Sequence, residues 1–382
     1  PLVSLALPGA LASLLADFVS PQLATFLAGG VSALLDVLLA CGETVAGWPG
    51  VSAWTSRATV VAGLVGVAAA NAVARQPGVS GSGRRALVSA YAATMIVGWP
   101  LFVRMEGRGA LELVMIDVGQ GDAIAIRSPS DRWILVDAGP PAGGLGRAQS
   151  VSEERVDHAA HPVVRALRDR GVGRLEALVL THPDLDHIGG ATAVLSSFAV
   201  GRVIDPGVPA PKSSYVDVLE DARDRSIPWI AARSGQTFEI DGVTLQVLHP
   251  QDSISGTDDA NTASVVILIS WRGFKALLTG DAYVGVEQRL IEEVGDVDVL
   301  KVGHHGSDTS SDSLFLARIR PEIALISVGR RNRYGHPSER VVRRLTNVGA
   351  EVHRTDREGT LRVTIRRDGS VRVQAERKGG TD

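Results

Sequence analysis

The sequence predicts a mixed α/β domain preceded by a helical membrane region. Segments with strand and helix character alternate from Leu111 to the C-terminus, and several strands follow one another closely enough to form hairpins. Residues 1–103 are mostly Ala, Leu, Val and Gly and carry very few charges. Several predicted strands end directly in an Asp or His side chain. We therefore expect two domains, with residues 1–103 in a membrane and 104–382 forming the α/β domain.

The apolar region contains two segments that are long enough to span a bilayer, 58–74 and 86–103. Each is close to the ~20 residues that a hydrocarbon core of ~30 Å requires. The apolar stretches 2–19 and 23–40 fit helices that are buried in a membrane bundle or lie along its surface. A buried helical domain in water is the alternative, and the shortage of charged residues to cover its surface argues against it.

The link between the two predicted spans, 75–85, holds three arginines and no acid. By the positive-inside rule this short loop faces the cytoplasm, which places the α/β domain on the extracytoplasmic side of the cell membrane. Arg57 and Arg104 weaken that asymmetry. The chain begins with Pro1 rather than Met, so we expect it to be the C-terminal piece of a longer multi-pass protein.

Charge and cysteine content narrow the chemistry. The formal net charge is −3, so bulk electrostatics does not indicate a nucleic-acid-binding protein, and an anionic substrate needs a local patch or a metal. Cys41 is the single cysteine, which excludes an internal disulfide and a thiolate cluster. Any bound metal must therefore be held by histidine and carboxylate side chains.

The α/β domain opens with a predicted meander of strands at 111–119, 122–128 and 133–139. A helix follows within 154–172, with Pro162 near its start and Gly171 past its end. The strand from Leu175 then runs into the loop THPDLDHIGG (181–190). Further strands are predicted at 243–250, 264–270, 274–281, 298–305 and 323–329, helices at 286–294, 311–319 and 339–349, and a final hairpin turn at Asp368–Gly369. The many hairpins predict a largely non-parallel sheet arrangement.

Potential metal ligands stand at the ends of four of these strands. They are Asp137, His182, Asp281, and the pair His304 and His305. A single Asp or His at a strand end is most often a hydrogen-bonded turn residue. Four such endings, one of them followed by further acids and an imidazole, instead predict a metal site, because strand ends are rigid mounts for converging side chains.

The spacing of these residues resembles that of the metallo-β-lactamase superfamily. The family's signature H-x-H-x-D-H after a strand stands here as His182, Asp184, Asp186 and His187, with aspartate at the second position. Asp281 matches the family's bridging aspartate, Gly303–His304 its last histidine, and Asp137 the acid that buttresses the loop. The resemblance implies an αββα sandwich for the α/β domain.

A narrower resemblance covers more of the chain. The motifs DVGQGDA (117–123), ILVDAG, THPDLDHIGG, LLTGDA, LKVGHHGSDTS and NRYGHPS together look like the outer domain of ComEC-type DNA-internalisation proteins. In that family a membrane competence channel precedes a metallo-β-lactamase-like domain. The resemblance implies a nuclease that degrades the non-transported strand, with single-stranded DNA, the membrane and other DNA-uptake proteins as partners.

The resemblance also implies two divalent ions. We assign His182, Asp184 and Asp281 to one ion, and Asp186, His187, Asp281 and His304 to the other; whether His304 or His305 is the ligand stays open. The family's middle histidine is missing, and Asn261 is the nearest candidate by position. Oxygen donors favour Mn²⁺ or Mg²⁺ over Zn²⁺, although Zn²⁺ remains a candidate. The alternative is a single bound ion.

Two divalent ions ~3.5–4 Å apart activate water and neutralise phosphate oxygens, which favours phosphodiester hydrolysis. We expect Asp186 to be essential, and His305 or His336 to donate a proton to the leaving oxygen. Arg333 and Tyr334 suit phosphate and an unstacked base, although a solvated loop is the plainer alternative. Ser307 can contact a phosphate or cap a helix.

Two other functions remain open from the sequence. The same metals would serve a hydrolase of a small molecule or a cell-wall phosphoester. The aspartate at the second position and the missing histidine also fit a non-catalytic domain that binds DNA beside a channel.

Overall fold

The computed structural model describes residues 109–143, 158–208, 212–251 and 259–377, together with residues 20–22, 25 and 83. The chain divides into two compact units, and the unit discussed below comprises Phe102–Arg168 and Val172–Asp382. The predicted spans 58–74 and 86–103 lie outside the described residues. Within the described part of the chain, every helix is too short or too polar to cross a bilayer.

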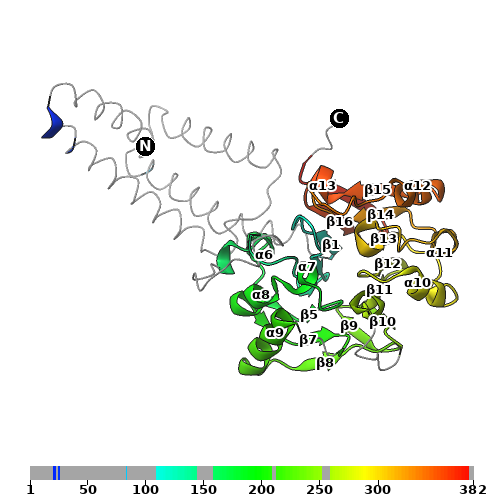
Figure 1. The fold of residues 1–382 in the computed structure, drawn as a ribbon, viewed down its shortest axis with the longest axis horizontal. Coiled ribbons are helices and arrows are strands. Elements are labelled where there is room, and N and C mark those ends of the chain that lie inside the picture. Colours follow the sequence, from blue (N-terminus) through cyan, green and yellow to red (C-terminus); the bar gives the residue numbers. More distant parts are fainter. Residues whose placement is uncertain are drawn as a thin grey trace. The chain divides into compact units, whose positions relative to one another are not determined.

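Two large sheets form the centre of the domain (Figure 1). The first has the order β17-β16-β1-β2-β3-β5-β7-β8, and the second the order β15-β14-β13-β12-β11-β10-β9. The strands of the first sheet are β1 (Leu111–Met115), β2 (Ile124–Arg127), β3 (Trp133–Val136), β5 (Ala177–Val179), β7 (Val203–Asp205), β8 (Trp229–Ala231), β16 (Leu361–Ile365) and β17 (Val371–Ala375). Those of the second are β9 (Thr237–Ile240), β10 (Val243–His249), β11 (Val266–Trp271), β12 (Phe274–Leu278), β13 (Val299–Lys301), β14 (Ile323–Ile326) and β15 (Glu351–Arg354). The pair β4 (Arg174–Leu175) and β6 (Ala199–Val200) stands apart.

Helices cover the outer face of each sheet. The α-helices are α6 (Pro162–Asp169), α7 (Leu185–Ile188), α8 (Ala191–Ser197), α9 (Ser213–Asp224), α10 (Val284–Leu290), α11 (Ser313–Ile319), α12 (Glu339–Asn347) and α13 (Thr355–Glu358). Three single turns of 3₁₀ helix complete the set, η2 (His158–Ala160), η3 (Ala260–Ala263) and η4 (Gly303–Gly306). Capping side chains mark two helix starts, because Asp312 accepts a hydrogen bond from Leu314 N and Ser338 accepts one from Val341 N.

Three apolar layers hold the four-layer sandwich together. The middle layer lies between the sheets and includes Leu113 of β1 and Ile267 of β11. One outer layer packs α6, α8 and α9 on the first sheet, and the other packs α10, α11 and α12 on the second. Alternating residues of β1 face different layers, since Leu113 joins the middle layer and Val114 the outer one. Burying each such side chain stabilises the fold by about 1.5–3 kcal/mol.

The sheets are more parallel than the sequence predicts. The hairpins are antiparallel from β17 to β3 and from β9 to β12. The remaining neighbours, β3-β5-β7-β8 and β12-β13-β14-β15, are parallel. The expected largely non-parallel arrangement is therefore wrong for three of the seven neighbouring pairs in the first sheet and three of the six in the second, because helices cross between those strands and return the chain in the same direction.

The parallel strands of both sheets have their carboxyl ends on the same side of the domain. In the first sheet, β3 and β5 both run toward this side, and Asp137 and Thr181 follow them. In the second sheet, β12 and β13 do the same, and Asp281 and His305 follow them. Carboxyl ends of parallel strands lie at the same sheet edge, so the fold collects polar residues from both sheets at one place.

Candidate metal centre

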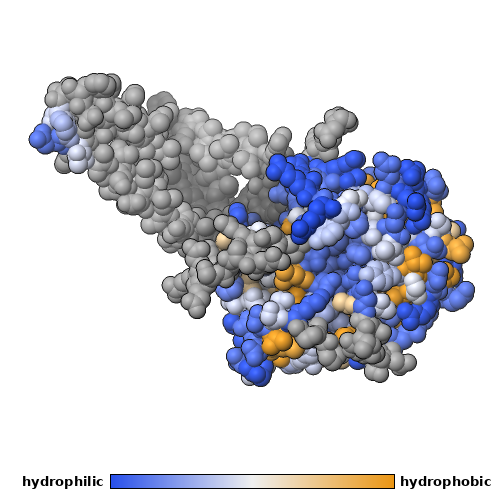
Figure 2. Space-filling model, viewed as in Figure 1, coloured by the Kyte–Doolittle hydropathy of each residue, from blue (hydrophilic) through white to orange (hydrophobic). Residues whose placement is uncertain are grey.

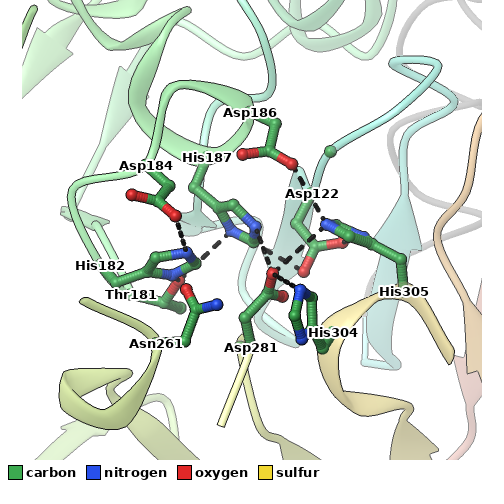
Figure 3. A network of polar contacts seen from close by, with 12 residues as sticks. Asp122, Thr181, His182, Asp184, Asp186, His187, Asn261, Asp281, His304 and His305 are labelled. Atoms are coloured by element: carbon green, nitrogen blue, oxygen red, sulfur yellow. Dashed lines mark hydrogen bonds and ion pairs between the residues drawn. The ribbon is translucent and has the colours of Figure 1, made fainter. Parts of the chain in front are cut away.

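The site is built from loops and short helices that follow buried strands (Figure 3). His182 lies three residues after the end of β5, and Asp186 and His187 lie on α7, which begins after Asp184. Asp281 follows β12, and His305 lies in η4. Asp137 and His305 have φ values of 57° and 54°, a left-handed backbone that is uncommon for residues with a side chain. Such strained positions cluster at functional sites.

Gly121 of the DVGQGDA motif allows the loop after β1 to lie against α7. A Cβ at this position would lie 2.1 Å from the carbonyl oxygen of Asp186. The same approach lets the backbone N–H of Asp122 donate to Asp186 O at 3.2 Å. A glycine at this position is therefore required for Asp122 to enter the site.

Hydrogen bonds hold three imidazole rings with their Nε2 atoms facing the centre. His187 Nδ1 donates to Asp137 Oδ2 at 2.8 Å, and His305 Nδ1 donates to the carbonyl oxygen of Ser327 at 3.0 Å. His182 Nδ1 lies 3.0 Å from Thr181 Oγ1, whose own hydroxyl donates to Asp137 Oδ2 at 2.8 Å. In each ring the Nδ1 proton is engaged, so Nε2 is left to act as a ligand.

The facing atoms form overlapping groups with metal-ligand geometry. One group is His182, His187 and Asp281, and a second is Asp186, His187 and His305, with the ligand atoms of each within 4.8 Å of one another. Asp281 Oδ2 joins the two groups, since it lies 3.4 Å from both His187 Nε2 and His305 Nε2. This is the donor chemistry of a site for one or two divalent ions, because imidazole and carboxylate are their common ligands.

An independent observation supports a cation at this place. Several buried polar atoms lack a hydrogen-bond partner among the described residues, and three of them are the inward-facing ring nitrogens His182 Nε2, His187 Nε2 and His305 Nε2. Buried polar groups are nearly always paired, and an unsatisfied one costs ~1–3 kcal/mol. A cluster of unpaired donors and acceptors therefore fits a bound metal.

The charges of the metal-free cluster are tightly linked. Burial works to lower the pKa of His305, but Asp281 and Asp122 outweigh it and raise the pKa to about 10. Asp281 and Asp137 likewise outweigh burial at His187 and raise its pKa well above the usual value. Burial and the neighbouring His187 lower the pKa of His182 to about 3. The carboxylate of Asp281 therefore favours positive charge next to it. Protonated His187 and His305 supply that charge when no metal ion is bound.

Asp122 and Lys301 are members of the site that the sequence analysis missed. Both side chains are almost fully buried, and the ammonium of Lys301 forms an ion pair with Asp122. Burial works to raise the pKa of Asp122, but Lys301 and His305 outweigh it and lower the pKa. Asp122 stands in the quoted DVGQGDA motif, and Lys301 ends β13, the last strand before the histidine pair. Both residues lie within or next to motifs that carry predicted ligands, and this proximity in the sequence could have identified them as members of the site.

Asp184, predicted as a ligand together with His182 and Asp281, lies next to His182 but outside the converging groups. It belongs to none of the metal-type groups found among the described residues, and its carboxylate forms an ion pair with Lys212. Its Oδ2 is still 3.7 Å from His182 Nε2. An aspartate side chain is shorter than a histidine, and the carboxylate is held by Lys212, the residue that precedes α9.

His305 replaces His304 as the histidine that converges with the cluster. Within the described residues the metal-type groups include His305 and leave His304 out. His304 Nδ1 bonds Thr309 Oγ1 at 2.8 Å, and its Nε2 lies 3.8 Å from Asp281 Oδ2. Both rings direct Nε2 toward Asp281 Oδ2, but the His305 side chain is 2% exposed and 3.4 Å away, whereas that of His304 is 22% exposed and lines the rim.

Asn261 lies beside His182 and Asp281 in Figure 3, on η3. Its Nδ2 donates to the Tyr283 hydroxyl at 2.9 Å, while its Oδ1 is buried and lacks a partner among the described residues. The amide oxygen is therefore available to a cation at the place where the family supplies an imidazole. Ser307, by contrast, is 6% exposed and accepts a hydrogen bond from Thr309 Oγ1. It supports the residue that holds His304 and does not face solvent.

The loop before α12 extends from the rim of the site. The ring of His336 lies 5.7 Å from that of His304 and stacks on Tyr334, with centroids 5.9 Å apart and planes at 15°. Arg333 lies over the same tyrosine at 5.8 Å. Burial, with help from His304, lowers the pKa of His336. Tyr334 is 53% exposed. The described residues on the face of the molecule in Figure 2 are mainly hydrophilic, with scattered apolar side chains.

Comparison with known families finds one matching family model, described as the metallo-beta-lactamase superfamily. It matches residues 116–330, which is more than half of the chain and includes every residue of the cluster. Among solved structures, the metallo-beta-lactamase fold protein YhfI from Bacillus subtilis is similar over 69% of this chain and 100% of that chain. The sequence identity between the two chains is 15%, and the TM-score is 0.42.

Three relatives have names from competence and recombination. ComE operon protein 3 of Bacillus subtilis is 34% identical over 65% of this chain and 32% of its own length. Recombination protein 2 of Haemophilus influenzae is 32% identical over 69% and 30%, and Competence protein ComA of Neisseria gonorrhoeae is 32% identical over 68% and 33%. These names confirm the predicted resemblance to ComEC-type proteins. The chain matches about a third of the length of each relative.

Proposed function

The chain belongs to the metallo-β-lactamase superfamily, and from that membership we propose that it is a metal-dependent phosphodiesterase that cleaves a DNA strand during uptake across a membrane. The main support for this proposal is the cluster of His182, Asp186, His187, Asp281 and His305, whose inward-facing atoms are buried and largely unpaired. The names of the relatives support DNA as the substrate. We further propose that residues 1–103 lie in the membrane and that the α/β domain faces the extracytoplasmic side.

Bound divalent ions would supply Lewis acidity and an activated water for attack on phosphorus. The residues of this chain divide the remaining work. His182, His187, His305 and the carboxylates of Asp186 and Asp281 would hold the ions, and the amide oxygen of Asn261 would offer a further ligand next to His182. Asp137 and Ser327 keep the rings of His187 and His305 in the ligand tautomer.

The rim residues then position the substrate. His304 and His336 lie between the cluster and the exposed Tyr334. Burial lowers the pKa of both histidines, so at neutral pH their rings are uncharged and suit hydrogen bonding to phosphate oxygens better than proton donation. This assignment replaces the acid role expected for His305 and His336, since His305 is committed to the ions. Arg333 and Tyr334 provide a fork for phosphate and a ring for an unstacked base.

The experiment uses the full 382-residue chain, labelled single-stranded DNA and added Mn²⁺, Zn²⁺ or Mg²⁺. We expect metal-dependent cleavage that Asp186→Ala and His187→Ala abolish, while the exposed-surface control Asp217→Ala retains it. DNA binding without cleavage in any metal would contradict the nuclease and support a DNA-binding domain beside a channel.

A hydrolase of small or cell-wall phosphoesters is the remaining alternative, because the same cluster suits both. Inertness toward DNA, together with turnover of bis(p-nitrophenyl) phosphate, would favour this alternative. The exposed Tyr334 and Arg333 side chains favour DNA, since a small phosphoester needs no stacking surface outside the cluster.

A further inference from the structure

Lys301 is an unusual residue to find inside this fold. Its side chain is 1% exposed at the end of β13, among the largest fully buried side chains of the described residues. Lysine is almost never fully buried unless its charge is paired, because an isolated ammonium is costly to remove from water. The partners of its Nζ atom therefore indicate the role of this buried positive charge.

Three oxygen acceptors surround the Lys301 ammonium. It forms an ion pair with Asp122 Oδ2 and donates to the carbonyl oxygen of Gly280 at 2.8 Å. It also lies 3.6 Å from Asp281 Oδ1. The lysine thus stands between two carboxylates that belong to the metal cluster or border it.

The two oxygens of Asp281 face different partners. Oδ1 faces Lys301, while Oδ2 lies 3.4 Å from His187 Nε2 and His305 Nε2 and 3.8 Å from His304 Nε2. A carboxylate that is free to rotate can offer either oxygen, or both, to a cation. Here the ammonium and the three imidazoles hold the carboxylate in one orientation.

A third group with metal-ligand spacing lies on the ammonium's side of the cluster. Asp122, Asp281 and His305 have ligand atoms within 4.8 Å of one another, as the two groups described above do. In this group, however, both carboxylates already share the positive charge of Lys301. His305 lies with Nδ1 3.4 Å from Asp122 Oδ1 and Nε2 3.4 Å from Asp281 Oδ2, and its Nδ1 proton is already engaged by Ser327 O.

We propose that Lys301 is a positioning residue of the metal centre. Its ammonium takes Asp122 and Oδ1 of Asp281, so that Asp281 presents only Oδ2 to the ions and the Asp122–Asp281 pair takes no ion of its own. This inference depends on the metal binding proposed above and is independent of whether DNA is the substrate. A lysine with a purely structural role would influence stability alone.

The test is Co²⁺ titration of the full chain, followed by calorimetry for stoichiometry and by visible absorption for coordination geometry. Lys301→Met removes the ammonium and leaves two buried carboxylates uncompensated. We expect it to bind roughly one more Co²⁺ per chain than the wild type and to change the absorption spectrum, because a divalent ion then replaces the missing charge. Lys301→Arg keeps a cation and should restore the wild-type stoichiometry.

A double variant guards against failure of the single one to fold. Asp122→Asn combined with Lys301→Met removes both charges, and such paired removal is often tolerated. We expect this variant to bind no additional ion but to show an altered Co²⁺ spectrum, because Oδ1 of Asp281 is released. Lys275→Met, in the adjacent strand β12, is the matched control and should behave as the wild type.

The outcomes separate this inference from the metal centre itself. Wild-type stoichiometry and spectrum in a folded Lys301→Met or double variant would overturn the positioning role while leaving the metal centre intact. A wild-type chain that binds no Co²⁺ would overturn the metal centre, and the role of Lys301 with it. Loss of thermal stability with an unchanged spectrum would assign Lys301 a structural role only.

Discussion

Asp186 Oδ2 on α7 lies 3.3 Å from His305 Nε2 in η4. The first residue follows a strand of one sheet, and the second follows a strand of the other. The two side chains meet only because the sheets pack face to face through the middle apolar layer. Metal binding at this site is therefore coupled to correct packing of the whole sandwich, and it should stabilise the folded state.

Substitution of the two adjacent histidines should separate their roles. We expect His305→Ala to weaken Mn²⁺ binding by more than ~100-fold, since loss of outer-shell partners alone typically costs ~10–100-fold. His304→Ala should weaken it by less than ~10-fold, because His304 bonds Thr309 and lies on the rim. Isothermal titration calorimetry of both variants measures the difference. A larger effect from His304→Ala would contradict the geometry.

The second position of the signature should control metal preference. Asp184 is held by Lys212, so we expect Asp184→His to add an imidazole next to His182 and shift the preference from Mn²⁺ toward Zn²⁺ by ~10-fold or more. Competition between the two ions, followed by metal analysis, measures the shift. Asp217→His, on the exposed face of α9, is the matched control. An unchanged Zn²⁺/Mn²⁺ ratio would show that residue 184 lies too far from the ions to matter.

The exposed aromatic ring beside the rim should contribute to strand binding. We expect Tyr334→Ala to weaken binding of single-stranded DNA by ~5- to 150-fold, which corresponds to the ~1–3 kcal/mol of one base stacking on an aromatic ring. Metal affinity should stay at the wild-type value, because Tyr334 stacks on His336, which is not one of the proposed metal ligands. Fluorescence anisotropy reports the binding. Leu314→Ala removes another exposed apolar side chain and should have no effect.

Glu287 should make stability depend on pH. Burial raises its pKa to about 7, against backbone hydrogen bonds from Ser311 and Asp312 that lower it. In the unfolded chain the pKa of a glutamate is near its ordinary value of 4.5, so between pH 4.5 and 7 the folded state binds more protons. Stability from this group is therefore fully present below pH 4.5 and is lost as the pH rises through 7, by roughly 3 kcal/mol.

Glu287→Gln removes this titration. We expect the difference in unfolding free energy between wild type and Glu287→Gln to change between pH 4.5 and 7, as measured by urea denaturation at several pH values. The variant also loses one acceptor of the two backbone N–H groups, which lowers its stability at every pH. The exposed control Glu292→Gln should give a difference that is constant with pH. A constant difference for Glu287→Gln too would mean that its pKa is not raised.

Much of the site could be predicted from local pattern. Apolar runs of strand length that end in His182, Asp281 or the histidine pair mark both the strands and the ligands, because the alternation of buried side chains is a short-range property. The family model over residues 116–330 confirms the metallo-β-lactamase fold. The helices at 286–294, 311–319 and 339–349 were also predicted close to α10, α11 and α12, since capping and amphipathic spacing are local.

Other elements escaped prediction because their signals are weak. The strands β7 and β8 have three residues each, and α9 begins after Lys212 without a capping side chain. The parallel halves of the sheets depend on how helices return the chain, which hairpin signals do not report. Asp122 carries no ligand signature of its own and enters the site only because Gly121 lets its loop approach α7.

The sequence by itself determined the types of donor and the strands that present them, because residue chemistry and strand periodicity are local. Only the tertiary structure decided which donors converge: His305 over His304, Lys212 against Asp184, and Lys301 between Asp122 and Asp281. Convergence depends on side-chain direction at left-handed backbone positions and on the packing of two sheets. Those are long-range properties that emerge when the apolar layers close.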